Sequence, residues 1–174
     1  MATTSEHTTG TRALFSFPNP VNEVSARVVA GGVVLLSVAA LVSGWPWLVV
    51  AIAYGFVARV LSGPTLSPLG QLVTRVVTPR LRVAPKYVPG PPKRFAQAIG
   101  ATLTVAAAVL ALLGNQTAAD VLLVLVVVAA TLESVFALCI GCKIFAVLIR
   151  AGVIPASVCD SCNDIWAAKP ARPS

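Results

Sequence analysis

Four cysteines are the only concentrated set of reactive side chains in this chain of 174 residues, and they form two Cys-x-x-Cys pairs. Cys139 and Cys142 make the first pair, Cys159 and Cys162 the second, with residues 143–158 between them. This separation lies within the range of a four-cysteine zinc site. A redox dithiol is the other interpretation, because a helix end and a cation such as the adjacent Lys143 stabilise a thiolate. Both interpretations stay open. In one, the first pair is a redox dithiol and the second pair is its relay; in the other, all four cysteines bind one metal ion.

Glu133 is a further candidate, because an ionisable side chain inside a predicted membrane span is expensive to bury and is a functional candidate by default. The alternative is a structural ion pair with Arg27 or Arg59, which lie at a similar predicted depth. On an unbroken helix Glu133 and Cys142 would face opposite sides. Glu133 can therefore act as a base for Cys142 only if the helix breaks, and we expect that break at Gly141.

The composition indicates the surroundings in which these groups lie. Hydrophobic residues make up 57% of the chain and charged residues 11%, against about 25% charged in a typical soluble domain. Too few polar side chains remain to cover a water-soluble particle of this size, which excludes a conventional cytosolic enzyme and predicts an integral membrane protein. The single histidine, His7, stands in a polar N-terminal segment, so a histidine-dependent triad or haem is not expected.

Apolar patterning predicts an all-α membrane protein, a four-span helical bundle over residues 25–150. The uncharged run from Val28 to Ala58 is too long for one span of about 20 residues. It is interrupted at 44–47 by glycine and proline, which stop a helix, and by two tryptophans, which favour the membrane interface. We expect spans over 26–43, 47–61, 95–113 and 118–138. Residues 1–24 are expected to be a flexible tail, and 151–174 a cytoplasmic segment that holds the second cysteine pair.

The loop between the second and third spans predicts an amphipathic helix on the membrane surface. Ser67 can cap a helix whose first residue is Pro68, and apolar residues follow at helical spacing over 69–77. Basic residues surround this stripe, which is typical of a helix that lies in the interface. The apolar stretch Ile144–Ile149 is too short to span and is expected to continue the fourth span or to form a short surface helix. Arg59, at the end of the second span, is expected to reach the headgroups.

The distribution of charge predicts the orientation. All 13 Lys and Arg residues lie in the N-terminal tail, at the inner end of the second span, in the central loop or after the fourth span. By the positive-inside rule, both termini and the central loop face the cytoplasm, with the chain in the cytoplasmic (inner) membrane. The net charge of +7 is then explained by topology and anionic lipid. A nucleic-acid partner is not expected, since Tyr87 is the only aromatic residue of the basic loop.

Three stretches resemble an uncharacterised bacterial membrane family, the domain of unknown function 4395. They are Gly90-Pro-Pro-Lys-Arg-Phe-Ala-Gln97, Gly63-Pro-x-x-Ser-Pro-Leu69 and Leu138-Cys-Ile-Gly-Cys-Lys-Ile-Phe145, and the resemblance covers about residues 15–150. The family has no established activity. The resemblance implies a thioredoxin-like or sulfurtransferase partner, and hence thiol or sulfane-sulfur chemistry.

Three functions follow from these observations. The first is a membrane thiol-redox or sulfur-handling protein that works through Cys139 and Cys142, with Cys159 and Cys162 as the relay. The second is a non-enzymatic membrane protein in which the four cysteines hold a metal such as zinc and form a docking element. The third is a small transporter, which ranks last because the halves show no repeat. Spacing alone favours the metal, and the resemblance favours the thiol chemistry.

Overall fold

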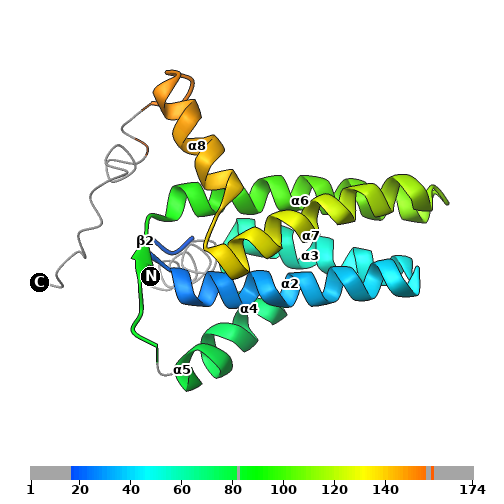
Figure 1. Cartoon of the computed structure of the whole chain (residues 1–174), viewed down its shortest axis with the longest axis horizontal. Helices are drawn as coiled ribbons and strands as arrows, with labels where there is room; N and C mark the ends of the chain where they lie inside the picture. The colour runs from blue at the N-terminus through cyan, green and yellow to red at the C-terminus, as the bar shows by residue number, and fades with distance from the viewer. Residues whose placement is uncertain (1–16, 82, 156–157, 159–174) are drawn as a thin grey trace, which may run out of the picture.

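The computed structural model describes residues 17–81, 83–155 and 158, and most of these lie in helices. Four helices lie side by side as an elongated bundle: α2 (Glu23–Ser43), α3 (Pro46–Ser62), α6 (Gly90–Leu112) and α7 (Gln116–Phe136) (Figure 1). The turns α2–α3 and α6–α7 lie at one end of this bundle, and the remaining elements lie at the other. The predicted all-α class is confirmed.

Three of the four helices, α2, α6 and α7, are long and apolar enough to cross a membrane. The fourth, α3, is a shorter apolar helix of 17 residues. Large apolar side chains on the outside of the bundle are exposed, as Leu35, Val42 and Val121 illustrate with exposed fractions of 74%, 84% and 58%. An apolar outer surface of this extent is suited to lipid rather than water. The chain is therefore compatible with a multi-pass membrane protein.

The helix ends follow from local sequence signals. The Asn22 side chain accepts a hydrogen bond from the backbone N–H of Val24 at 3.0 Å and so caps α2. Gly44 ends α2 in the left-handed conformation, with φ 62°, and Pro46 begins α3. The predicted interruption at 44–47 is thus confirmed. Asn115 caps α7 by accepting from the backbone N–H of Ala118 at 3.2 Å.

The interior of the bundle is made largely of small side chains. Ala107, Ala119 and Leu123 are completely buried. Where α3 crosses α6, a Cβ atom on Gly100 would lie 2.3 Å from Cε1 of Phe56, so glycine is required for this approach. Close packing of small residues is the usual way in which apolar helices associate in lipid, where burial of apolar surface gives little driving force.

The loop after α3 folds as a helix along the end of the bundle. It comprises α4 (Pro68–Leu72), a π-helical turn η1 (Val73–Val77) and α5 (Thr78–Arg80). The predicted cap is present, since Ser67 Oγ accepts from the backbone N–H of Gly70 at 3.2 Å. Val73 is buried, whereas Leu72 is 52% exposed. Only some of the apolar residues over 69–77 therefore pack against the bundle.

Two short strands close this end of the molecule. β1 (Val21–Asn22) pairs antiparallel with β2 (Tyr87–Val88), which joins the start of α2 to the loop before α6. The Asn19 side chain also accepts a hydrogen bond from the backbone N–H of Gly90 at 3.0 Å. Of the predicted tail over 1–24, residues 1–16 lie outside the described part. Finally, α8 (Ile140–Arg150) leaves the end of α7 and runs across α6, away from the bundle (Figure 1).

Candidate functional site

The first cysteine pair lies where the chain turns from α7 into α8. Helix α7 ends at Phe136, and Ala137 follows in the left-handed conformation with φ 55°. The predicted break at Gly141 is therefore wrong, because the chain turns several residues earlier. Gly141 instead lies in the first turn of α8, where a Cβ atom would be 2.5 Å from the Cβ of Ala96. Glycine is needed here to bring the start of α8 against α6.

Cys139 is the N-cap of α8. Its Sγ accepts a hydrogen bond from the backbone N–H of Cys142 at 3.4 Å, and both thiols are free. The Cys139 residue is 8% exposed, and Cys142 is half-buried. The hydrogen bond from the Cys142 thiol, assisted by the charge of Lys93, lowers the pKa of Cys139. That same hydrogen bond, together with burial, raises the pKa of Cys142. Cys139 is thus the thiol that ionises first.

Glu133 forms an ion pair with Lys93 next to this dithiol. Lys93 Nζ lies 2.5 Å from Glu133 Oε1, and the side chains are only 9% and 15% exposed. The predicted pairing of Glu133 with Arg27 or Arg59 is wrong. Arg27 instead donates from Nε to the carbonyl oxygen of Ser134 and from Nη2 to that of Val135, near the end of α7. The sequence also predicted Lys143 as the cation that stabilises a thiolate. Lys143 is exposed, however, and the positive charge that acts on the Cys139 thiol is that of Lys93.

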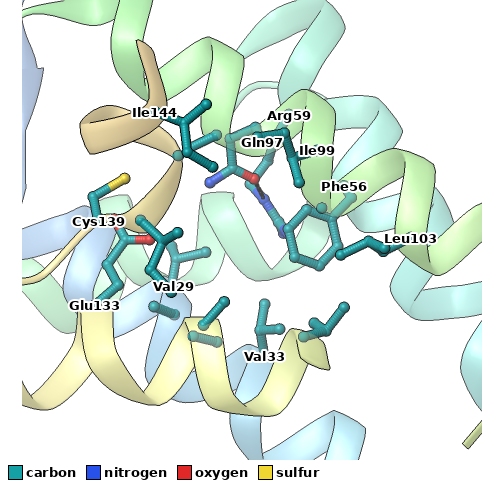
Figure 2. Close-up of a pocket in the computed structure, with 18 residues that line it drawn as sticks. Val29, Val33, Phe56, Arg59, Gln97, Ile99, Leu103, Glu133, Cys139 and Ile144 are labelled. Carbon is teal, nitrogen blue, oxygen red and sulfur yellow. Dashed lines mark hydrogen bonds between the residues drawn. The ribbon is translucent and has the colours of Figure 1, made fainter. Parts of the chain in front are cut away.

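A cavity of about 110 Å³ opens beside Cys139, between α2, α3, α6, α7 and the start of α8. Glu133 and Cys139 lie at one side of it, and Arg59 and Gln97 at the other (Figure 2). The remaining wall is mostly apolar and includes Val29, Val33, Phe56, Ile99, Leu103 and Ile144. A concave apolar pocket with a few convergent polar groups is the usual form of a small-molecule site.

Arg59 is buried in the wall of this cavity, with 6% of the residue exposed. Its Nε donates to Gln97 Oε1 at 2.9 Å, and its Nη1 donates to Ser67 Oγ at 3.2 Å. The guanidinium carbon lies 4.4 Å from the centre of the Phe56 ring. The predicted position of Arg59 at the headgroups is therefore wrong, because its side chain points into the protein.

The sequence identified two members of this site, Cys139 and Glu133. It named Arg59 only as an ion-pair partner or a headgroup contact, and it missed Lys93 and Gln97. Each missed residue is polar and stands inside or at the end of a predicted span, and this was the only available signal. The second pair, Cys159 and Cys162, lies outside the described residues, as does any contact between the two pairs. Within 17–81 and 83–155, no three His, Cys, Asp or Glu side chains converge as metal ligands.

Comparison with known proteins gives one match. The model of a family described as "Domain of unknown function (DUF4395)" matches residues 21–150, which confirms the resemblance found in the sequence. No curated protein and no solved structure matches the chain.

Proposed function

The chain belongs to the DUF4395 family, and we propose that it is a membrane protein that carries out thiol–disulfide or sulfur-transfer chemistry at Cys139 and Cys142. The observation that supports this most strongly is the cap of α8, where the backbone N–H of Cys142 donates to Cys139 Sγ at 3.4 Å. A helix N-terminus stabilises a thiolate, and the second thiol stands one turn further on, within reach of the first.

The proposed reaction is an exchange in which bonds and electrons balance. The Cys139 thiolate attacks one sulfur of a disulfide, forms a mixed disulfide and releases the other sulfur as a thiolate. Cys142 then loses its proton and attacks Cys139 Sγ, which forms the Cys139–Cys142 disulfide and releases the second thiolate. The two electrons pass from the dithiol to the substrate. Glu133 lies on the same side of the cavity as Cys139, its charge acts on Cys142, and it is the carboxylate that we propose as acceptor of the Cys142 proton.

The proposed topology has four spans, with α3 as the shortest. Helix α3 is about 25 Å long at 1.5 Å per residue, which local thinning of the bilayer can accommodate. The positive-inside rule supports an orientation with the end bearing α4, α5 and α8 in the cytoplasm of a bacterial inner membrane. In that position α4, η1 and α5 form the cytoplasmic interfacial helix. The proposed protein partner is thioredoxin-like or a sulfurtransferase.

A four-cysteine metal site is the second candidate, because the spacing of the two Cys-x-x-Cys pairs favours it. Such a site would hold the C-terminal segment on the bundle as a docking element, with zinc as the expected metal. The two candidates differ in what they expect of single cysteine variants, since a metal site uses four equivalent ligands and a dithiol uses two unequal ones.

The test uses hydroxyethyl disulfide, a small neutral probe, and the purified protein in detergent at neutral pH. In Cys142→Ser, the serine hydroxyl still donates a hydrogen bond, and Cys139 should retain a mercaptoethanol adduct because no resolving thiol follows. In Cys139→Ser, Cys142 should react far more slowly than Cys139 does in the first variant, because burial still disfavours its thiolate and no backbone N–H of the α8 N-terminus donates to its sulfur. The native chain should lose both thiols and form the Cys139–Cys142 disulfide. Mass spectrometry of peptides distinguishes these products.

Size-exclusion chromatography of each variant controls for folding. Equal adducts at the two positions, or none in either variant, would contradict the proposed dithiol. One zinc ion per chain, lost equally on replacement of any of the four cysteines by serine, would establish the metal site in its place.

A further inference from the structure

Arg59 forms no salt bridge with a carboxylate among the described residues, although the charge of Glu133 acts on it from across the cavity. Two charged residues line the cavity, Arg59 and Glu133, and Glu133 is already paired with Lys93 at 2.5 Å. The Arg59 contacts are to neutral groups: an amide oxygen, a hydroxyl and the face of an aromatic ring. A buried charge of this kind is costly unless an opposite charge lies close to it. Arg59 and Lys93 thus share the single carboxylate of Glu133, which leaves one positive charge in excess beside the cavity.

The size and lining of the cavity limit what can supply the missing negative charge. Its volume of about 110 Å³ is somewhat smaller than a cavity of about 150 Å³ that holds benzene. The wall away from Arg59 is apolar, with Val33 and Leu103 among its residues (Figure 2). A multiply charged ion would find only one cation here, whereas a small organic monoanion matches both the charge and the apolar wall.

We propose that this cavity binds a small organic monoanion whose carboxylate is held by Arg59. A planar guanidinium is suited to a carboxylate, because its N–H groups lie in the plane of both oxygens. Gln97 accepts from Arg59 Nε and so fixes the orientation of the guanidinium. The other end of the ligand then lies toward Cys139, on the opposite side of the cavity. Binding of the anion does not depend on the reaction of the thiol. Its role as a substrate, a small carboxylate-bearing thiol or disulfide, rests on the proposed function.

The first experiment compares alkylation of Cys139 by iodoacetate and by iodoacetamide. The two reagents are matched in size and transfer carbon to the same thiolate with loss of iodide, but only iodoacetate is an anion. Their rate ratio therefore cancels the intrinsic reactivity of the thiolate. Arg59→Gln should lower the iodoacetate-to-iodoacetamide ratio roughly tenfold, as expected for a charge-assisted contact away from bulk water. Arg94→Gln is the control, because Arg94 is an exposed cation at the same end that does not line the cavity.

The second experiment needs no reactive ligand. Propionate should slow the alkylation of Cys139 by neutral iodoacetamide in the native chain and in Arg94→Gln, and it should give no protection in Arg59→Gln. Because Arg59 also bonds Ser67 at the start of α4, Arg59→Gln can disturb folding. Arg59→Lys keeps the charge without the planar fork and should give an intermediate ratio and intermediate protection.

The outcomes separate this inference from the proposed function. In one outcome, propionate protects Cys139 only when residue 59 is a cation, but the dithiol does not exchange with a disulfide. This outcome would establish the anion site and contradict the proposed thiol function. An active dithiol with no protection by propionate, and with the same reagent ratio in the native chain and Arg59→Lys, would overturn the anion site and leave the thiol function in place.

Discussion

The charges that act on the Cys139 thiol come from residues that lie far apart in the sequence. Lys93 lies in the first turn of α6 and Glu133 near the end of α7, yet their side chains meet beside Cys139. The two charges act on the Cys139 thiol in opposite directions, because a cation stabilises a thiolate and an anion destabilises it. The ion pair is therefore a means of adjusting the fraction of Cys139 that is ionised at a given pH.

Replacement of either charge should move the pKa of Cys139 in a defined direction. Lys93→Met removes the cation and should raise this pKa, whereas Glu133→Gln removes the anion and should lower it further. A shift of about one pKa unit changes the thiolate fraction roughly tenfold at a pH below the pKa. The measurement is the rate of Cys139 alkylation by iodoacetamide against pH, with the midpoint lower in Glu133→Gln and higher in Lys93→Met than in the native chain.

Lys143→Met serves as the control for this series. Lys143 is adjacent to Cys142 in sequence but exposed in the structure, so its removal should leave the midpoint nearly unchanged. A midpoint that moved with Lys143 and not with Lys93 would contradict the arrangement of charges around the thiol.

At the scale of elements, the position of α8 decides whether Cys139 faces the cavity. Phe145 and Ile149 of α8 are buried, and the Phe145 ring packs on Phe95 of α6 with 5.5 Å between centroids. The two helices approach closely at Gly141, which lies against the backbone and side chain of Ala96. Because Cys139 caps the same helix, any displacement of α8 from α6 also displaces the thiol.

Gly141→Ala should therefore impair both packing and thiol chemistry. The added methyl would lie 2.6 Å from the Ala96 Cα, which a rotation of side chains alone does not relieve. Overpacking of this kind typically costs about 1–3 kcal/mol. We expect a lower midpoint of thermal unfolding in detergent and a changed alkylation rate at Cys139. Gly55→Ala is the matched control, since its new Cβ would meet only the end of the Arg59 side chain at 3.4 Å. Equal behaviour of the two variants would argue against a special role for the α6–α8 contact.

These elements also show which parts of the fold could be predicted from the sequence. Helices α2, α3, α6 and α7 follow from apolar runs bounded by local signals such as Gly44 and Asn115, and both signals act within a few residues. The turn at Ala137 has no such signal, because alanine is a strong helix former and favours the left-handed conformation only under tertiary constraint. The site could not be predicted in this way, because it is formed by contacts between different helices. The sequence shows that Lys93 and Gln97 are polar, but not which residues they contact.

At the scale of the whole molecule, the described charges gather at one end. The Lys and Arg residues there are Arg27, Arg59, Arg75, Arg80, Lys86, Lys93, Arg94, Lys143 and Arg150. The end with the α2–α3 and α6–α7 turns has Asp120 as its only charged side chain among the residues described, and exposed Trp45 and Trp47 lie there as well (Figure 1). The bundle is thus polarised along its length, with the dithiol and the cavity near its basic end.

This polarity predicts that the thiol chemistry takes place on the cytoplasmic side of the membrane. A basic end stays on the cytoplasmic side during insertion, and its attraction to anionic lipid adds about 1 kcal/mol per Lys or Arg near the surface. Alkaline phosphatase, which is active only outside the cytoplasm, should be active when inserted at Gln116 in the α6–α7 turn and inactive when fused after Ser174. Green fluorescent protein should give the opposite pattern at the same two positions. The reverse result would place Cys139 toward the oxidising side, where its disulfide rather than its thiolate would be the resting form, and the dithiol would then oxidise its partners instead of reducing them.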